Sequence, residues 1–224
     1  MTEHKSEISV GGKSIRDKPL EEVASLEFTE AIWLVLRGNI PSSEEKDLLN
    51  VVLSSIIEYG IETPSTRTAR TIQTSGNSLN ASVAGGVLSI GDYHGGAGEA
   101  CMALLQDDKS ASEIVTEFMD RGDRIPGLGH KAFTSYDPRT RAMFEKARSL
   151  ELDGNHIEKI EAIQEILSQH DLDLVINADG GLAAVLSDLG WEPEYGKGIF
   201  IIGRVPGLVA HVREEMDHQP FRQI

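Results

Sequence analysis

Short stretches of the chain place a histidine or an aspartate beside glycines, an arrangement that can expose a reactive side chain to a ligand. In SIGDYHGGAGEA, His94 precedes a glycine pair that opens a predicted helix. Glycines let a ligand approach the backbone closely, and a helix N-terminus offers free N–H groups to a developing negative charge. His94 is therefore a candidate to stabilise an oxyanion. The alternative is a turn with an incidental surface histidine.

The stretch RIPGLGHKAFTSYDPRTR contains three arginines, a lysine and a histidine together with two glycines that make its backbone flexible. Its glycine amides can bind a flat base or phosphates, and its arginines are suited to carboxylates. A capping Asp-Pro pair explains residues 137–138 alone, so the stretch predicts a receptor for an anionic ligand. Its candidate residues are Gly127, Gly129, His130, Lys131, Arg139 and Arg141.

Asp179 and Arg204 are charged residues in otherwise apolar surroundings. Asp179 lies between the apolar run DLVINA and two glycines, where partial desolvation raises a carboxyl pKa and suits an acid or a base. The alternative role, which does not exclude the first, is the N-cap of the next helix. Arg204 interrupts FIIGRVPGLVAH, and a buried arginine needs an anionic ligand or a structural ion pair.

The other histidines and the cysteine show no pattern of a metal or redox site. His156, His170 and His218 are expected on polar helix faces or in the tail, without metal-ligand spacing, so we expect no metal. Cys101 is the single cysteine and sits at helical spacing in GEACMALL. We expect a buried thiol, no internal disulfide and a reducing, cytoplasmic environment.

Composition restricts the partners. The chain has 224 residues, a formal net charge of −15 and a pI near 4.8, so its far field repels nucleic acid and anionic lipid. Any anionic ligand must therefore be held by a local cluster of positive groups. The first ten residues lack a signal-peptide core, and no apolar run approaches the roughly 20 residues of a membrane span. We expect neither a nucleic-acid nor a membrane partner.

Helix signals dominate the segments that must position these residues. Capping boxes are predicted at Ser42 with Glu45 and at Ser110 with Glu113. The first half of 198–216 is ambiguous because β-branched residues cluster there. The pattern as a whole predicts an all-α protein. The predicted helices cover 17–38, 41–60, 110–122, 137–154, 155–170 and 180–190.

With these motifs in this order, the chain resembles the citrate synthase superfamily, most closely its citryl-CoA lyase branch, which includes the C-terminal lyase module of ATP-citrate lyase. IPGLGHKAFTSYDPR is similar to the family's GxGHxxxxxxDPR signature, INADGGLAAVLSDLG to its NxD segment and FIIGRVPGLVAH to its xxRxxGxxAH segment. The resemblance covers nearly the whole chain. It implies a citrate-synthase-like fold with a large domain (1–97 with 198–224), a small CoA-binding domain (98–197) and the active site in the cleft.

The resemblance also implies roles. His94 matches the residue that stabilises the enolate of acetyl-CoA, Asp179 matches the acid or base at the methyl carbon, and His130 matches a catalytic ligand of the oxaloacetate or citryl group. Arg222 matches an arginine that reaches across a dimer. The implied substrate-binding residues are Arg67, Arg139, Arg204 and Arg222, and the implied CoA-binding residues are Gly127, Leu128, Gly129 and Lys131.

One segment departs from the family pattern. Citrate synthases carry an H-x-D-H run shortly before xNAS, whereas SGNSLNAS has Asn77 and no histidine. Arg67 and Arg70 are candidates to supply positive charge instead. The departure weakens the case for a free citrate synthase, because polarising a ketone for condensation is the demanding step.

The resulting prediction is a citryl-CoA lyase that cleaves citryl-CoA reversibly to acetyl-CoA and oxaloacetate, with coenzyme A as part of the substrate and no other cofactor. A compact citrate or 2-methylcitrate synthase is the first alternative. A non-catalytic acyl-CoA-binding subunit is the second. The resemblance further implies a homodimer or homotetramer, and a lyase could depend on a separate citryl-CoA synthetase for its substrate.

Overall fold

The structure is a computed structural model that describes residues 6–9 and 12–218. Its contacts divide the chain into two compact units, Met1–Asn50 and Val51–Ile224. Most of the described residues are helical, which confirms the predicted all-α class.

The first unit combines a small antiparallel sheet with short helices. The strand order is β1-β2-β3, with Ser6 opposite Ile15 and Ser14 opposite Pro19. The sequence analysis did not predict this sheet, and the single helix predicted over 17–38 is wrong, because the chain forms β3 and then two separate helices. The elements are β1 Ser6–Ser9, β2 Gly12–Ile15, β3 Lys18–Pro19, α1 Leu20–Ala24, α2 Phe28–Arg37 and the start of α3 Ser43–Ser55.

The predicted capping signals are present in both units. The Ser42 N–H donates to the Glu45 carboxylate at 2.7 Å, and the Glu45 N–H donates to the Ser42 hydroxyl at 3.1 Å. Ser110 and Glu113 form the same reciprocal pair at the start of α7. These bonds satisfy N–H groups that the first turn of a helix leaves free.

The second unit holds the remaining helices. α3, which ends at Ser55, stops before the predicted Gly60, and residues 56–60 continue without helix. The bounds are α4 Pro64–Thr74, α5 Leu79–Leu88, α6 Ala97–Gln106, α7 Ala111–Arg121, α8 Pro138–Ser149, α9 Asn155–Gln169, α10 Ala178–Asp188 and α11 Glu194–Met216.

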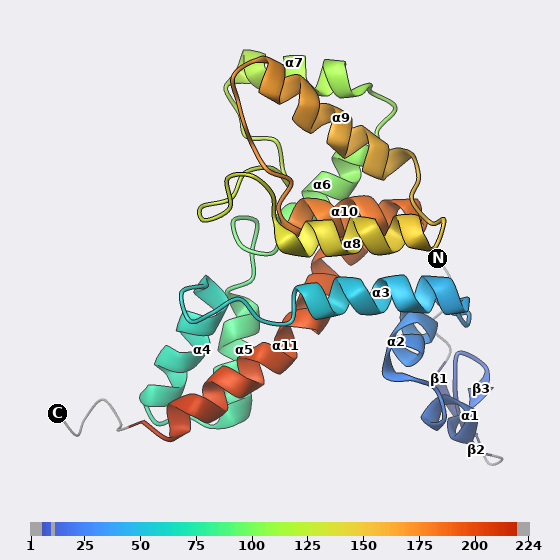
Figure 1. Ribbon diagram of the computed structural model, residues 1–224. Helices are drawn as coiled ribbons and strands as arrows, with labels where there is room; N and C mark the ends of the chain where they lie inside the picture. The colour runs from blue at the N-terminus through green and yellow to red at the C-terminus, as the bar shows by residue number, and fades with distance from the viewer. Residues whose placement is uncertain (1–5, 10–11, 219–224) are drawn as a thin grey trace. The chain divides into compact units, whose positions relative to one another are not determined.

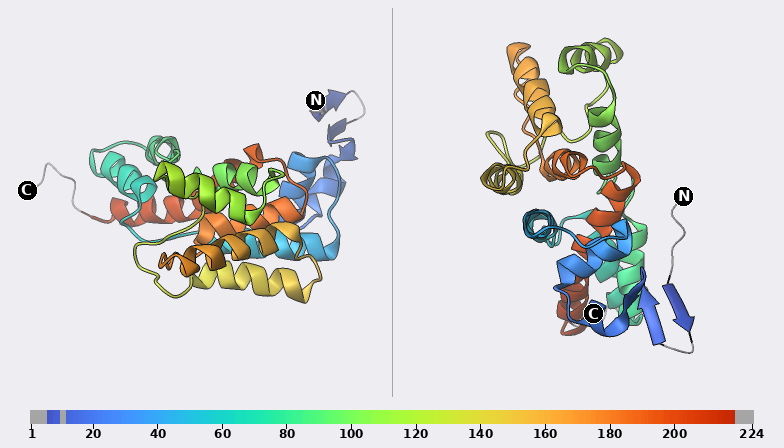
Figure 2. Two further views of the ribbon diagram at one scale, coloured as in Figure 1. Left: turned by 90° about the horizontal axis from the view of Figure 1, so that it is seen from above. Right: turned by 90° about the vertical axis from the view of Figure 1, so that its right-hand side faces the viewer.

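Helix α10 is the centre of one half of this unit. It packs against α6, α8 and α9, and the views in Figures 1 and 2 show it between α8 and α6. Nearly every residue of α10 is buried, since its small and apolar side chains leave room for close neighbours on all sides. The N-terminus of α10, which carries Asp179, is therefore held rigidly.

Helices α4, α5 and α11 form the other half of the unit. Ala69, Leu208 and Val212 make a buried cluster, against which Val83 and Val87 pack. The ambiguous stretch 198–216 lies entirely in α11, which runs from Glu194 to Met216 and contains Pro206 in its interior. Burial of its apolar residues in this packing overrides their preference for strand.

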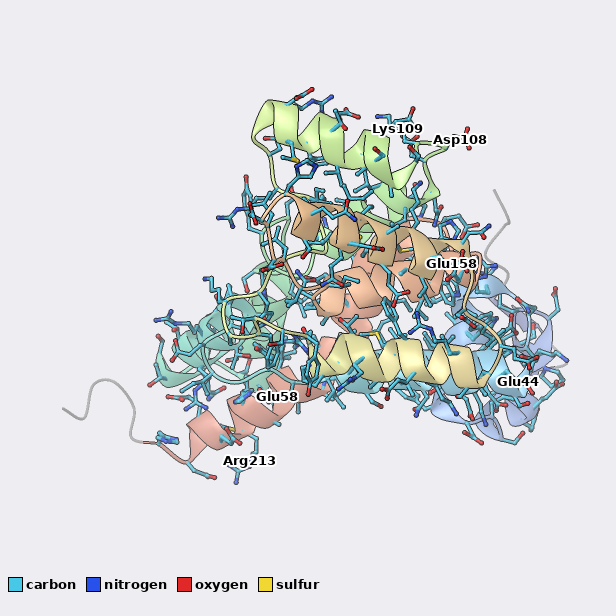
Figure 3. All side chains as sticks on the ribbon, turned by 45° about the horizontal axis from the view of Figure 1, so that its top comes forward. Glu44, Glu58, Asp108, Lys109, Glu158 and Arg213 are labelled. Atoms are coloured by element: carbon cyan, nitrogen blue, oxygen red, sulfur yellow. The ribbon has the colours of Figure 1, made fainter. Side chains whose placement is uncertain are left out.

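Charged side chains of both signs lie on the surface of the second unit. Figure 3 shows Lys109, Glu158 and Arg213 there, and each of these side chains is exposed. Over residues 6–9 and 12–218, no helix has the length and apolarity needed to cross a membrane.

Candidate functional site

A cavity of about 610 Å³ in the second unit brings the predicted site residues together. Three distant glycine-rich junctions reach it, at residues 94–95, 129–132 and 177–179, together with α11. Arg222 lies outside the described residues, and Gly127 and Leu128 do not line the cavity. The predicted residues that do are Arg67, His94, Gly129, His130, Lys131, Arg139, Asp179 and Arg204.

The loop that follows Gly129 fixes the tautomer of His130. The backbone N–H groups of Ala132 and Phe133 both donate to its Nδ1, each at 3.0 Å. A ring nitrogen that accepts two hydrogen bonds carries no proton, so the neutral imidazole has its proton on Nε2. Partial burial, and then the charge of Arg139, lower the pKa of His130. His130 is therefore a neutral donor that presents its Nε2–H to the cavity.

Tyr59, which the sequence analysis did not consider, contacts this donor. Its Oη lies 3.1 Å from Nε2 of His130, and the Arg139 guanidinium carbon lies 4.2 Å from the centre of its ring. Since Nε2 carries the proton, the Tyr59 oxygen accepts this hydrogen bond. Tyr59 and His130 are 71 positions apart, so no local pattern signals their contact.

Arg139 is held in place by Asp137. Nε of Arg139 donates to Oδ1 at 3.0 Å and Nη2 donates to Oδ2 at 2.6 Å, a two-point ion pair. Asp137 is 1% exposed and also accepts the Arg139 N–H as the N-cap of α8, as predicted. The pair presents a fixed guanidinium to the cavity.

His94 is neutral and oriented by Ser65. Burial, and then the charge of Arg204, lower the pKa of His94 from 6.5 to about 4. Ser65 is 0% exposed, and its Oγ lies 2.8 Å from Nε2 of His94. We assign the proton of this neutral ring to Nδ1, with the Ser65 O–H donating to Nε2, because this tautomer leaves an N–H free for a ligand. The sequence analysis missed Ser65.

Asp179 lies in the first turn of α10 but does not cap it. Asn177 is the N-cap, and its Oδ1 accepts the N–H groups of Asp179 and Gly180. The N-cap alternative for Asp179 is therefore wrong. Its Oδ1 is enclosed and, within the described residues, without a hydrogen-bond partner. Burial raises the pKa of Asp179, as predicted, although the charges of Arg139 and Arg204 oppose the effect.

Arg204 is 3% exposed, and its guanidinium is only partly satisfied. Nε donates to the Ile56 carbonyl at 2.8 Å, whereas Nη1 is enclosed without a partner in the described part of the chain. No carboxylate of that part lies within ion-pair distance, so the alternative of a structural ion pair is wrong for these residues. Gly207 allows this approach of α11, since a Cβ there would lie 2.3 Å from the Ile57 carbonyl oxygen.

The Gly127–Gly129 turn packs closely against Cys101 of α6 and Gly180 of α10. Gly127 has a φ of +84°, and a Cβ there would lie 2.7 Å from both the Cys101 sulfur and the Gly180 Cα. The N–H of Leu128 donates to the Ile125 carbonyl and that of Gly129 to Val175, at 3.3 and 2.7 Å. These amides are thus occupied within the protein, and coenzyme A contacts at this turn stay a prediction.

The SGNSLNAS segment, which corresponds to the family's histidine-containing run, does not reach the cavity. Asn77 does not line the cavity, and its side-chain amide donates to the Ile72 carbonyl at 3.0 Å. Arg70 pairs with Glu215 at 2.7 Å, whereas Arg67 lies at the cavity and is largely exposed. The chain instead approaches the cavity with residues 59–67.

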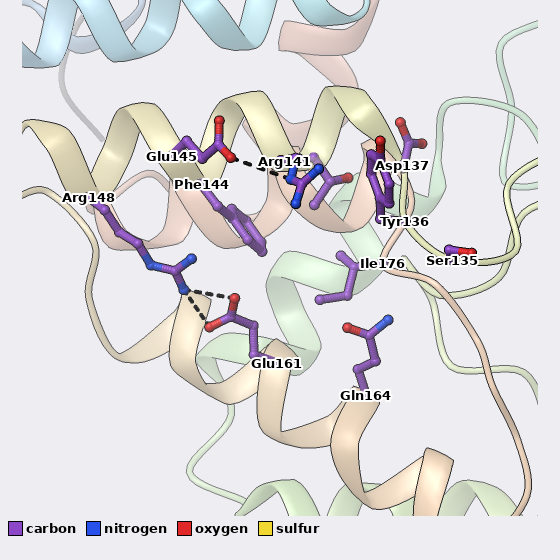
Figure 4. A pocket seen from close by; sticks show the side chains of 11 residues that line it. Ser135, Tyr136, Asp137, Arg141, Phe144, Glu145, Arg148, Glu161, Gln164 and Ile176 are labelled. Carbon is purple, nitrogen blue, oxygen red and sulfur yellow. Dashed lines mark hydrogen bonds and ion pairs between the residues drawn. The ribbon is translucent and has the colours of Figure 1, made fainter.

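A second cavity, about 300 Å³ in volume, lies beside α8 and α9 (Figure 4). Its charged residues are already paired, with Arg148 donating to Glu161 at 2.6 and 2.7 Å and Arg141 lying 3.4 Å from Glu145. The first cavity, by contrast, encloses unpaired groups of both charges. That contrast, and not size, identifies the first cavity as the candidate active site.

No group of three or more histidine, cysteine, aspartate or glutamate side chains among residues 6–9 and 12–218 could hold a metal ion. Cys101 is free and buried, as predicted.

The helical fold and this cavity define a citrate-synthase-like protein. Residues 6–223 match the family described as citrate synthase, C-terminal domain, and the chain belongs to the citrate synthase family. The family resemblance inferred from the motifs is thereby confirmed.

Solved structures share the fold. The chain is 39% identical to citryl-CoA lyase from Hydrogenobacter thermophilus, with a TM-score of 0.93 over 100% of this chain and 90% of that one. ATP citrate lyase from Methanothrix soehngenii, solved with citrate and coenzyme A, is 20% identical, with a TM-score of 0.84 over 99% of this chain and 40% of that one. The predicted citrate-synthase-like fold is confirmed.

Curated relatives are longer proteins. Citrate synthase from Deinococcus radiodurans is 30% identical over 189 residues, which are 80% of this chain and 50% of that protein. 2-Methylcitrate synthase from Shewanella oneidensis is 30% identical over 187 residues, 81% of this chain and 50% of that protein. The chain thus spans about half the length of these relatives.

Proposed function

We propose that the chain is a citryl-CoA lyase, which cleaves citryl-CoA to acetyl-CoA and oxaloacetate in a reversible retro-aldol reaction. The observation that carries the proposal is the pair of enclosed, unpartnered groups in one cavity, Oδ1 of Asp179 and Nη1 of Arg204. A citryl-CoA ligand would meet both groups, with a carboxylate at Nη1 of Arg204 and the carbon that exchanges a proton at the carboxyl group of Asp179. The 39% identity to a protein named citryl-CoA lyase, over nearly the full length of both chains, supports the same substrate.

Cleavage requires charge to be stabilised at the thioester. The hydroxyl proton of the citryl group leaves, the carbon–carbon bond breaks, and its electron pair moves to the thioester as an enolate. In the proposed reaction the Nδ1–H of His94 donates to the enolate oxygen, in an orientation that the Ser65 contact supports. Loss of one preorganised donor of this kind costs about 3–4 kcal/mol of transition-state stabilisation.

The enolate carbon must then receive a proton. We assign this step to Asp179, since burial raises its pKa and so favours the protonated form that can deliver one. Its carboxyl becomes a carboxylate as the methyl group of acetyl-CoA forms. Arg204 and Arg139 lower the cost of that negative charge.

The other half of the substrate carries carboxylates. Arg139, fixed by Asp137, and Arg204, with its open Nη1, are suited to bind them, and Arg67 lies at the same cavity. We assign His130, which lines the same cavity, to the side that receives the developing ketone. Two further assignments are proposed on the family resemblance alone. The residues proposed to contact coenzyme A are Gly127, Leu128, Gly129 and Lys131. Arg222 is proposed to reach into the active site of a second copy of the chain.

The remaining assignments follow from this function. We propose a large domain formed by 1–97 with 198–224 and a small domain formed by 98–197, and the cavity draws residues from both. We further propose a homodimer or homotetramer in the cytoplasm, needing no metal or redox cofactor. A separate citryl-CoA synthetase would supply the substrate.

A compact citrate or 2-methylcitrate synthase remains the second candidate, because the curated relatives at 30% identity carry those names. It would use the same groups in the condensation direction. A non-catalytic acyl-CoA-binding subunit is less well supported, because it gives the unpaired Asp179 no chemical task.

One pair of assays separates these candidates. The purified protein is mixed with citryl-CoA, and oxaloacetate is followed through malate dehydrogenase and NADH. In parallel, oxaloacetate and acetyl-CoA are mixed with the protein and a thiol reagent that detects free coenzyme A. Rapid oxaloacetate release without comparable condensation supports the lyase. Rapid condensation supports the synthase, and binding of citryl-CoA without turnover supports the non-catalytic subunit.

A further inference from the structure

The proposed lyase reaction leaves one proton without an acceptor. The tertiary hydroxyl of the citryl group must lose its proton as the ketone forms. His130 is of the residue type that most often acts as a general base. Its Nδ1, however, accepts two backbone N–H groups at 3.0 Å, which places the ring proton on Nε2. The nitrogen that faces the cavity is thus a donor and has no lone pair free for the substrate proton.

We propose that Tyr59 is the further catalytic residue of this site and that its phenol oxygen exchanges the hydroxyl proton of the citryl group. The assignment rests on the proposed lyase function. It is carried by three observations: Tyr59 lines the cavity, its Oη lies 3.1 Å from Nε2 of His130, and the Arg139 guanidinium lies 4.2 Å from its ring centre.

Two polar neighbours of Tyr59 bear on the proton exchange. The Nε2–H of His130 donates to the phenol oxygen, and a hydrogen bond to a charged acceptor is stronger than one to a neutral acceptor. The positive charge of Arg139 over the ring adds an attraction that is largest when the ring carries negative charge. His130 thus acts on the substrate hydroxyl through Tyr59, whose oxygen accepts the Nε2–H.

The backbone around Tyr59 is anchored on both sides. The Ile56 carbonyl accepts a hydrogen bond from Arg204 at 2.8 Å. The Glu58 carboxylate lies 2.7 Å from Nε2 of His211 and accepts the N–H of Gly60. Figure 3 labels Glu58 beside α11, the helix that carries His211. The segment between α3 and α4 therefore holds the phenol at a fixed place in the cavity.

The step balances as follows. The Tyr59 phenolate takes the hydroxyl proton, the oxygen of that hydroxyl becomes the ketone oxygen of oxaloacetate, and the bond to the thioester carbon breaks. The electron pair forms the enolate, which takes a proton from Asp179. One proton is thus gained by Tyr59 and one is lost by Asp179, with no other reactant. Besides Tyr59, Asp179, His130 and Arg139, the charged or titratable groups at the cavity are Glu62, Arg67, Tyr93, His94, Lys131 and Arg204.

The test is the Tyr59→Phe variant, which keeps the ring beneath Arg139 and removes the oxygen. We expect kcat for citryl-CoA cleavage to fall by about 100-fold or more, the range for loss of an acid–base group. The dissociation constant of oxaloacetate, measured by calorimetry, should change by less than about tenfold. Tyr136→Phe is the matched control, because Tyr136 also lies under an arginine, Arg141 at 4.4 Å, but outside the cavity.

A second measurement separates proton transfer from packing. Incorporation of 3,5-difluorotyrosine at position 59 makes the phenol more acidic at nearly the same size. The rise of kcat/KM with pH should then move to lower pH, which a purely structural tyrosine would not cause. If the wild type cleaves citryl-CoA and kcat of Tyr59→Phe lies within threefold of the wild-type value, the Tyr59 assignment alone is overturned. A pH profile of kcat/KM that difluorotyrosine does not move overturns it as well. A wild-type protein that cleaves no citryl-CoA overturns the proposed function, and the Tyr59 assignment falls with it.

Discussion

The buried state of His94 predicts a specific dependence of stability on pH. The pKa of His94 falls from 6.5 to about 4 on folding, chiefly through burial. Between these values the unfolded chain binds a proton that the folded chain resists, so the free energy of unfolding falls as the pH falls. The linkage amounts to about 3 kcal/mol in full, and to about 2 kcal/mol between pH 7 and pH 5.

Urea unfolding followed by circular dichroism measures this effect. The wild type and His94→Gln are unfolded at pH 7, 6 and 5, so that the other groups titrate in both proteins and cancel. The wild type should lose about 2 kcal/mol more than the variant between pH 7 and pH 5. His170→Gln, which removes an exposed imidazole at the end of α9, controls for the loss of a histidine. Equal pH slopes for the wild type and His94→Gln would refute the buried, neutral state of His94.

Three substitutions test other parts of the site. Asp179→Asn should lower kcat by about 100-fold or more and raise the melting temperature above neutral pH, because a carboxylate whose pKa is raised by burial costs stability when ionised; a lower melting temperature would contradict this. Ser65→Ala should lower kcat/KM by about tenfold, the cost of about one hydrogen bond, through disorder of the His94 tautomer; unchanged kinetics would remove Ser65 from the site. Gly127→Ala should destabilise the fold by about 2 kcal/mol or more in urea, since its Cβ would lie 2.7 Å from Gly180 Cα at a φ of +84°; wild-type stability would show that the turn can relax.

Interactions within one turn of helix were predictable from the sequence. The Ser42–Glu45 and Ser110–Glu113 capping boxes join residues three positions apart, and the type of each residue specifies its partner. The same holds for Gly38, which ends α2 with a φ of 83° as the pattern indicated.

The strands of the first unit and the length of α11 were not predictable in this way. Strands β1 and β2 have four residues each, too few for an alternating pattern to stand out. Helix α11 contains a run that favours strand, from residue 198, and also contains Pro206. Its packing against α4, α5 and α6 decides the outcome.

The site was predictable where chemistry follows local context. His94, His130 and Asp179 stand beside glycines, and their motif order indicated that they meet. Tyr59 and Ser65 contact those residues across 71 and 29 positions, and neither stands in a motif that marks it. Long-range partners of this kind need the folded chain.

The central claim is that one cavity binds the citryl group between Asp179 and Arg204. The most direct measurement is a crystal structure of Asp179→Asn soaked with citryl-CoA. We predict a substrate carboxylate at Nη1 of Arg204, the thioester oxygen at Nδ1 of His94, and side chain 179 against the carbon that becomes the methyl group. Density for the thioester elsewhere, for example beside Arg141 and Arg148, with this cavity empty, would contradict the account.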